Sequence, residues 1–403
     1  MSNEKLRKET ENVIRKLWAA TLAYFRSIDR WFALLYVLLC GYGLLVVAGV
    51  AHSFSPKSNM LLVQASAMLI GAAAVIIISK FDYHSIARLW KLYLPAVLAL
   101  VALTFVVGAQ RGGADDRAWL LLPGGLSLQP SEFLKIAFIL TFALHIYVVG
   151  DRLNRPLNVL LLCLNGAWPV LLIHLQGDDG SALIFFVIFL VMAFCGGLAW
   201  PYMLAGLGLI GAAVPVMWNF VLNADQKQRI EALITPGSDP LGIELQQNKA
   251  RISIGSGQFF GRGLFAGDHN YVPEIQNDFI FSFIGEALGF VGCLLVFALF
   301  VLLFARILII ARRAADPLGR LICVGIFAML AAQLLLNLGM NLGVLPVIGV
   351  TLPFFSAGGS SIVTVSASIG LVMSVAVHSE KTMFEGVTIS LPQRRSRARR
   401  HVL

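Results

Sequence analysis

Long apolar runs separated by short polar segments fill most of the chain between residues 31 and 379. A helix needs roughly 20 apolar residues to cross about 30 Å of hydrocarbon, and ten of the runs are about that long. The pattern therefore predicts an all-α polytopic membrane protein with ten spans. They lie near 31–52, 59–81, 89–109, 132–150, 157–176, 180–198, 202–222, 279–305, 320–342 and 360–379.

The polar segments predict three regions. Residues 1–30 place apolar residues at helical spacing among lysines and arginines, which is typical of an amphipathic helix on an anionic membrane surface. Residues 31–380 form the predicted membrane domain, with one large loop at 223–278 between the seventh and eighth spans. Residues 381–403 form a basic tail, which we expect to contact membrane lipids rather than nucleic acid.

Composition supports the membrane assignment. Hydrophobic residues make up 58% of the chain and charged residues 13%, which excludes an ordinary soluble domain. No short apolar segment with a small-residue cleavage site precedes the first span, so we expect that span to act as the targeting signal. All five cysteines fall within apolar runs, which argues against a disulfide framework or a cysteine metal site.

The distribution of basic residues predicts the orientation. If both termini are cytoplasmic, 22 of the 31 lysines and arginines lie inside and 8 lie outside, with Lys135 within a span. This bias follows the positive-inside rule. The sequence therefore predicts a multi-pass protein of the cytoplasmic membrane, with the large loop on the outer side.

Asp278 stands where the large loop enters the eighth span, directly before Phe279. A carboxylate at this depth is costly to desolvate, so it is interpreted either as a helix cap or as a functional group. Glu286 follows eight residues later. On a continuous helix these two acids share a face, so we expect them to face the same cavity.

Two other outer segments carry unusual polar residues. Glu132 and Lys135 enter the fourth span after Gln129-Pro130-Ser131. They are interpreted as a helix start with an i,i+3 ion pair, or as groups that line a cavity or bind a lipid phosphate. In the turn 176–181 the acids stand at a helix N-terminus, where the macrodipole favours them.

The segment 344–361 carries no charge but contains two prolines and a Gly-Gly pair between serines. Irregular backbone at membrane depth has to be buried in protein or line an aqueous cavity, so we expect a re-entrant loop. Asn337 and Asn341, one helical turn apart, should face the same interior. The sequence shows neither a nucleotide-binding glycine pattern nor a histidine cluster with metal-ligand spacing.

Taken together, five motifs between residues 30 and 380 resemble the SEDS family, whose members include RodA, FtsW and SpoVE. They stand in the same order and spacing as in that family. The motifs are Gln129-Pro130-Ser131-Glu132 with Lys135; Gln176 to Ser181; Arg229 through Gly255-Ser256-Gly257 to Gly261-Arg262-Gly263; Pro273-Glu274 through Asp278-Phe279-Ile280-Phe281 to Gly285-Glu286; and Leu352-Pro353-Phe354-Phe355-Ser356-Ala357-Gly358-Gly359-Ser360-Ser361.

The resemblance implies a peptidoglycan glycosyltransferase that polymerises lipid II at the outer face of the bacterial cytoplasmic membrane. It also implies a class B penicillin-binding protein as partner, and it makes Asp278 the essential acid. Three features depart from the family pattern. Asn277 stands where the family has Thr, the turn that usually reads Pro-Asp-Leu-Gly is Gly177-Asp178-Asp179-Gly180, and Ala357 replaces a Tyr.

For this reaction Asp278 is the predicted general base, because a sugar hydroxyl is a poor nucleophile. The leaving diphosphate needs countercharge, with or without a divalent cation such as Mg²⁺ or Mn²⁺, and no other cofactor is predicted. The candidate cations on the outer side are Arg229, Lys249, Arg251, Arg262 and Arg117. The further candidates for lining the cavity or binding substrate are Glu286, Glu132, Lys135, Glu274, Ser356 and Ser360.

Two other functions remain open. A flippase for a lipid-linked precursor would also need a polar cavity among its helices, whereas a non-catalytic scaffold for the partner would leave the buried acids unexplained. The polar motifs cluster on one side of the membrane, while alternating access needs a site near the midplane, and this favours the enzyme. The sequence does not distinguish roles in elongation, division or sporulation.

Overall fold

In a computed structural model of the protein, the described residues are 27–54, 59–109, 118–122, 126–222, 224–235 and 244–385. Within these ranges nine helices are long and apolar enough to cross a membrane, and a tenth apolar helix, α8, has 17 residues. Each of the ten predicted spans coincides with one of these helices. The prediction of an all-α polytopic membrane protein is confirmed.

The apolar helices have the following bounds: α2 Arg30–Phe54, α3 Met60–Lys80, α5 Trp90–Val107, α6 Pro130–Val149, α7 Pro156–Leu175, α8 Asp179–Cys195, α9 Trp200–Val216, α12 Ile280–Arg313, α13 Pro317–Asn341 and α14 Gly359–Glu385. α14 therefore continues past residue 380, where the membrane domain was predicted to end. The rest of the predicted basic tail, and the predicted amphipathic segment up to residue 26, lie outside the described residues.

Several short elements were not predicted. They are the helix α4 (Tyr83–Arg88), the strands β1 (Leu120–Leu122) and β2 (Leu126–Leu128), the 3-10 helix η1 (Gly150–Arg152) and the π-helix η2 (Met217–Val221). Two further helices lie in the large loop, α10 (Ala224–Ile234) and α11 (Glu244–Ser256). The strands form an antiparallel hairpin in which Leu120 pairs with Leu128. This hairpin leads directly into α6 and fixes the point at which that helix begins.

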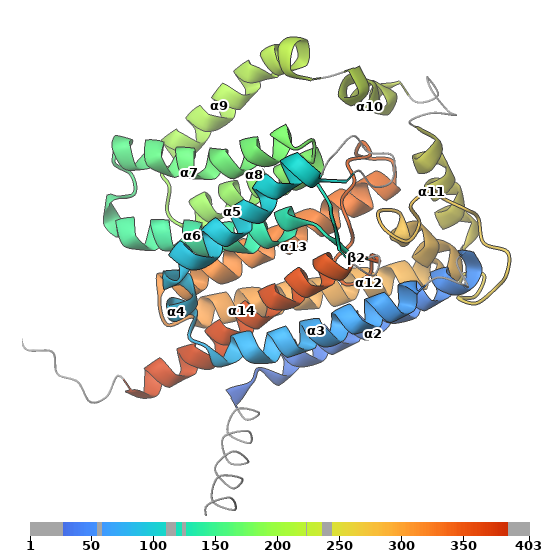
Figure 1. Cartoon of the computed structure of the whole chain (residues 1–403), viewed down its shortest axis with the longest axis horizontal. Helices are drawn as coiled ribbons and strands as arrows, with labels where there is room; N and C mark the ends of the chain where they lie inside the picture. The colour runs from blue at the N-terminus through green and yellow to red at the C-terminus, as the bar shows by residue number, and fades with distance from the viewer. Residues whose placement is uncertain are drawn as a thin grey trace, which may run out of the picture.

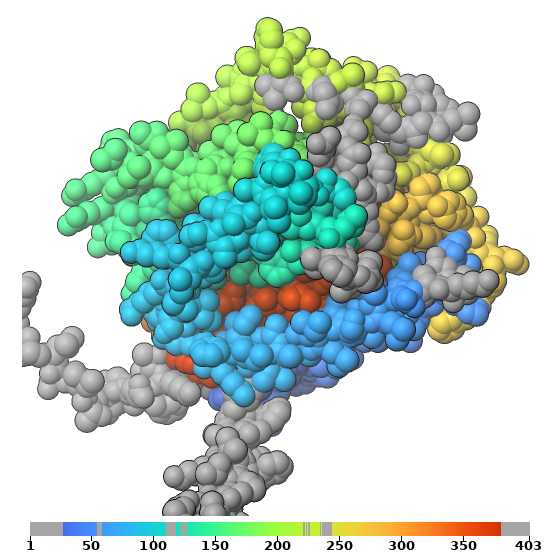
Figure 2. All heavy atoms as spheres, in the orientation of Figure 1, coloured from blue at the N-terminus to red at the C-terminus, as the bar shows by residue number. Residues whose placement is uncertain are grey.

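The most buried helices are α13 and α14. In their apolar windows 72% and 83% of residues are buried, whereas α9 has none, and Figure 1 shows α9 on the outside beyond α7 and α8. α14 packs against α3, and α13 packs against α12, α8 and α6. In Figure 2 the red atoms of α14 form the floor of a furrow between α3, in blue, and the cyan and teal helices α5 and α6.

α12 is broken near its start. It has 34 residues and is about 50 Å long, but Gly289 has a non-helical backbone with φ 65°. A Cβ atom at Gly289 would lie 2.4 Å from the amide nitrogen of Gly261, so this position requires glycine. The chain after α11 packs closely against the break: the amides of Arg262 and Gly263 donate to the carbonyls of Glu286 and Ala287, both at 2.9 Å. The glycines of this motif therefore allow two backbones to approach closely.

Candidate active site

Asp278 lies just before α12. The helix begins at Ile280 and Phe279 occupies the N-cap position, so Asp278 itself is one residue outside the cap. Its backbone carbonyl accepts hydrogen bonds from Asn337 Nδ2 at 2.8 Å and Asn341 Nδ2 at 2.9 Å. Both asparagines are fully buried, so they face the interior, as the sequence predicted. They fix the position of Asp278 against α13.

The wall beside the Asp278 carboxylate is the irregular segment between α13 and α14. A Cβ atom at Gly349 would lie 3.7 Å from Asp278 Oδ2, and the carbonyl of Val350 accepts from Asn337 Nδ2 at 2.7 Å. The second half of the segment is buried in protein: Phe355 is fully buried and Phe354 is 1% exposed, whereas Val344 in the first half is 65% exposed. It therefore has the properties expected of a re-entrant loop next to the acid.

Ser356 fastens the turn that carries Asp278 from the other side. Its hydroxyl donates to the carbonyl of Asn277 at 2.6 Å and accepts from the amide of Leu352 at 2.8 Å. Asn277 Nδ2 in turn donates to Glu274 Oε2 at 2.7 Å. Asn277, which stands where the related family has Thr, thus supplies a hydrogen bond inside the turn. Glu274 and Ser356 both position the segment that bears Asp278.

Glu286 is fully buried in a separate polar network. Its carboxylate accepts from Ser253 Oγ at 2.7 Å, from the Asn270 amide at 3.0 Å and from Asn270 Nδ2 at 2.8 Å, and it pairs with Arg262 Nη1 at 3.2 Å. Because α12 begins after Asp278, helical periodicity does not relate the two acids. Glu286 ties α11 and the following loop to α12.

Glu132 and Lys135 form the predicted i,i+3 ion pair on α6. Lys135 Nζ lies 2.7 Å from Glu132 Oε1, and the lysine side chain is fully buried. The second carboxylate oxygen, Oε2, is buried without a hydrogen-bond partner in the described part of the chain. A buried charged oxygen left in this way needs water or a ligand. This unpaired oxygen is the observation that supports a cavity-lining or ligand-binding role for Glu132 and Lys135.

The start of α6 meets two other predicted motifs. Gln129 Nε2 donates to Asp178 Oδ2 at 2.9 Å, and the Gln129 amide donates to Ser360 Oγ at 3.3 Å. Asp178 also caps α8 by accepting from the Ser181 amide at 2.9 Å, which confirms the helix-start interpretation of that turn. Motifs far apart in the sequence are therefore brought together at one end of the bundle.

The predicted outer cations divide into two groups. Arg229 Nη1 donates to the Val347 carbonyl at 3.1 Å, and the Arg251 side chain lies against Gly343. These two arginines lie along the segment that walls Asp278. Arg262 instead lies at Glu286, and Lys249 Nζ lies over the ring of Tyr271, 5.9 Å from its centroid. Arg117 lies outside the described residues.

Gln333 was not predicted as a site residue from the sequence. It is fully buried on α13, one helical turn from Asn337, and neither of its amide atoms has a hydrogen-bond partner among the described residues. Its signal was present in the sequence, because Gln333, Asn337 and Asn341 stand four residues apart within one apolar span. A row of amides on one helix face indicates a polar interior.

The described residues contain no group of three or more His, Cys, Asp or Glu side chains placed to hold a metal ion. We therefore assign no residue of the described chain as a metal ligand.

The fold and the site define a polytopic helical membrane protein with buried polar groups gathered at one end of the bundle. Residues 30–381 match the family described as the FtsW, RodA and SpoVE cell cycle proteins. The chain belongs to this family.

Curated relatives give the family an activity. The peptidoglycan glycosyltransferase MrdB of Escherichia coli K12 is 37% identical over 292 residues, which cover 71% of this chain and 77% of that protein. A probable peptidoglycan glycosyltransferase FtsW of Trichlorobacter lovleyi is 32% identical over 360 residues, which cover 85% of this chain and 91% of that protein. This chain is accordingly a glycosyltransferase.

Solved structures agree with this assignment. A chain from a structure described as the structural coordination of polymerization and crosslinking by a peptidoglycan synthase complex superposes with a TM-score of 0.75 and 30% identity, covering 87% of this chain and 98% of that chain. The rod shape determining protein RodA of Thermus thermophilus superposes with a TM-score of 0.64 and 28% identity, covering 87% and 96%.

Proposed function

We propose that this chain polymerises lipid II into glycan strands of peptidoglycan at the outer face of the bacterial cytoplasmic membrane. The names of the curated relatives support the choice of polymer. The observation that carries the proposal is the position of Asp278, which the two asparagines of α13 hold by its carbonyl and whose carboxylate lies beside Gly349 of the segment 344–358. A carboxylate whose backbone is held in this way suits proton transfer, because that step requires a preset geometry.

In the proposed reaction Asp278 is the general base. It accepts the proton of the sugar 4-hydroxyl while that oxygen bonds to the anomeric carbon of a second lipid II. The bond from this carbon to the diphosphate breaks, and undecaprenyl diphosphate leaves with the electron pair. General base catalysis of this kind typically contributes about 10²–10⁴-fold in rate.

The leaving diphosphate develops negative charge that cations must balance. Arg229 and Arg251 suit this role best, because both lie along the segment beside Asp278. Positive groups fixed next to a developing anion lower the barrier without reorganising during the reaction. The described residues contain no cluster of three or more His, Cys, Asp or Glu side chains that could hold a metal ion, so the mechanism is written for the arginines alone.

The reaction is proposed to invert the anomeric centre in a single displacement. Asp278 acts as a base on the acceptor and forms no covalent sugar intermediate, which would require an acid placed as nucleophile. The furrow floored by α14 runs between the apolar helices α3 and α5, and it suits an isoprenoid tail (Figure 2).

The proposed partner is a class B penicillin-binding protein, which crosslinks the strands as they are polymerised. The structure of a peptidoglycan synthase complex that contains a similar chain supports an association of this kind. The basic residues at the predicted cytoplasmic side are proposed to contact membrane lipids. The charge bias in the sequence supports the proposed location in the cytoplasmic membrane and the outward-facing site.

A reconstitution experiment tests the proposed function against its alternatives. The purified chain and its partner are placed in liposomes with labelled lipid II, and the products are separated on a gel. We expect a ladder of glycan polymers. Transfer of lipid II between leaflets without polymer would instead identify a flippase, and neither product would identify a scaffold.

A further inference from the structure

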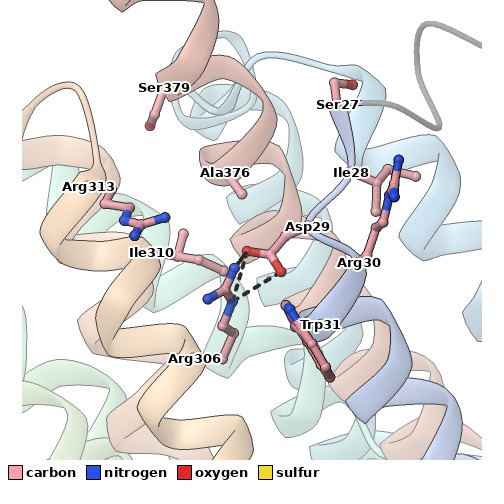
Figure 3. Close-up of a pocket in the computed structure, with 10 residues that line it drawn as sticks. All are labelled: Ser27, Ile28, Asp29, Arg30, Trp31, Arg306, Ile310, Arg313, Ala376 and Ser379. Carbon is pink, nitrogen blue, oxygen red and sulfur yellow. Dashed lines mark hydrogen bonds and ion pairs between the residues drawn. The ribbon is translucent and has the colours of Figure 1, made fainter.

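A pocket of about 530 Å³ lies at the opposite end of α12 from Asp278 (Figure 3). It is formed by the start of α2, the end of α12 and the end of α14. Figure 3 shows Arg313 directed toward the centre of this pocket, where Asp29 and Arg306 are joined. Its lining residues are Ser27, Ile28, Asp29, Arg30, Trp31, Arg306, Ile310, Arg313, Ala376 and Ser379.

Asp29 is the one acid among the lining residues, and its carboxylate is both ion-paired and hydrogen-bonded. Its carboxylate accepts from Arg306 Nε at 2.9 Å and from Arg306 Nη2 at 2.5 Å, and it caps α2 by accepting from the Phe32 amide at 3.0 Å. Arg306 thus cancels the charge of Asp29. Arg30 and Arg313 are left without an ion-pair partner among the described residues, so the pocket carries an uncompensated positive charge.

The depth of the pocket matches the headgroup layer of a membrane. Arg30 is the first residue of α2 and Arg313 the last of α12, so both lie at the ends of membrane-spanning helices. Trp31 is 68% exposed in the first turn of α2, and tryptophan is enriched at the boundary between lipid and water. A ligand would reach this pocket from among lipid headgroups.

We propose that this pocket binds the phosphodiester headgroup of an anionic glycerophospholipid. Arg313, which is directed toward the centre of the pocket, binds the phosphate oxygens, because the planar guanidinium presents paired donors that match a phosphate. Arg30, on the other side of the start of α2, adds positive charge at the rim. Ile28, Ile310 and Ala376 provide apolar surface for the glycerol and upper acyl carbons. The Asp29–Arg306 pair holds α2 and α12 at the spacing that keeps the pocket open. The inference goes beyond the glycan chemistry and does not depend on Asp278.

The test compares two adjacent arginines. Both are exposed at the end of α12, but Arg313 lines the pocket and Arg312 does not. Binding of phosphatidylglycerol to the purified full chain in detergent is measured by native mass spectrometry and by thermal stabilisation. We expect Arg313→Gln to weaken binding by about fivefold or more. Arg312→Gln should change it by less than about twofold, because Arg312 does not line the pocket and a charge outside it is screened by solvent and salt.

Two further ligands identify the source of the phosphate. Phosphatidylcholine should bind the wild-type chain more weakly than phosphatidylglycerol, and inorganic phosphate at the same concentration should give no stabilisation. Equal losses in Arg312→Gln and Arg313→Gln would overturn the proposed site. Equal binding of the two lipids would overturn its preference for an anion, and stabilisation by inorganic phosphate alone would overturn the lipid as its ligand.

Discussion

At the scale of single residues, Asp278 is positioned through its backbone. Asn337 and Asn341 hold its carbonyl, and Ser356 holds the carbonyl of the preceding residue, Asn277. These hydrogen bonds hold the backbone of the turn through carbonyl oxygens and do not use the carboxylate. Because the positioning hydrogen bonds are made to the backbone, an amide in place of the carboxylate should remove proton transfer and leave the turn in place.

The buried pair of Glu132 and Lys135 gives a test of what these charges contribute to stability. Removing one member of a buried pair leaves an uncompensated charge, which typically costs about 3–5 kcal/mol. We expect Lys135→Met to lower the free energy of unfolding by about that amount. Thermal or denaturant unfolding of the purified protein in detergent measures it.

The matched control for this pair is the double variant Glu132→Gln with Lys135→Met. It removes both charges and should recover much of the lost stability, because two neutral side chains leave no unpaired ion. A double variant as unstable as Lys135→Met alone would show that the ion pair is not the source of the effect.

The sequence was sufficient to find Asp278, the ion pair on α6 and the two asparagines of α13, because each is a polar residue in an apolar run. It did not show which groups surround Glu286. Its partners Ser253 and Asn270 are ordinary loop and helix residues, and only the fold brings them to the carboxylate. The pairing of Asp29 with Arg306 was hidden for the same reason, since the two residues are 277 positions apart.

At the scale of elements, the break in α12 explains the glycine motif that follows α11. Gly261 has φ +78°, and a Cβ atom there would lie 2.3 Å from the carbonyl oxygen of Ala287. The carbonyls freed by the break are satisfied by amides of the adjoining chain, as irregular backbone at membrane depth requires. Periodicity alone predicted an unbroken span, because the residues on both sides of the break are apolar.

A pair of glycine substitutions tests this contact. Gly261→Ala should destabilise the protein by about 2 kcal/mol or more, because the new Cβ meets backbone and the residue keeps a positive φ. Gly255→Ala is the control: it lies within α11 and its Cβ would meet no atom within 4 Å, so its effect should be neutral or slightly stabilising. Equal melting temperatures for the two variants would contradict the close approach.

The short helix α4, between the spans α3 and α5, carries a histidine that lies between two carboxylates. His84 Nδ1 lies 3.0 Å from Asp82 Oδ1 and Nε2 lies 2.5 Å from Asp316 Oδ2. Burial alone would lower the pKa of His84, but its hydrogen bonds to the two carboxylates outweigh burial and raise that pKa above 6.5. Burial would likewise raise the pKa of Asp82, and the hydrogen bonds from His84 outweigh it and lower that pKa.

The sign of the resulting pH effect follows from these shifts. Protonated His84 is favoured in the folded state, so its contribution to stability is complete below pH 6.5 and is lost as pH rises through the raised pKa. The contribution of Asp82 is lost only in acid, as pH falls through its lowered pKa. We expect His84→Gln to lower the melting temperature more at pH 6 than at pH 9. His52→Gln, a change to an exposed histidine, is the control and should show no such difference.

At the scale of the whole molecule, hydrophobic length was sufficient to predict all ten apolar helices, because crossing a bilayer demands nearly continuous apolar sequence. The polar elements were not predictable in this way. Helices α10 and α11 lie in the large loop, where the apolar pattern is weak, and the hairpin β1–β2 has strands of three residues. The site depends on these elements, since Arg229 and Arg251 come from α10 and α11.

The two ends of the bundle have different chemistry. Asp278 and its surrounding motifs lie at the start of α12, and the basic pocket at Arg313 lies about 50 Å away at its other end. A single helix thus spans the proposed glycan site and the proposed lipid site. In the orientation that the positive-inside bias predicts, the pocket faces the cytoplasmic leaflet and Asp278 the outer side.

The most direct test of the central claim measures polymer formed from lipid II by the reconstituted chain with Asp278→Asn. The account predicts a loss of at least about 100-fold in rate with unchanged thermal stability and partner binding. Asp268→Asn, a change at an exposed acid of the same outer region, should retain full activity. Polymerisation by Asp278→Asn at the wild-type rate would contradict the assignment of Asp278 as the base.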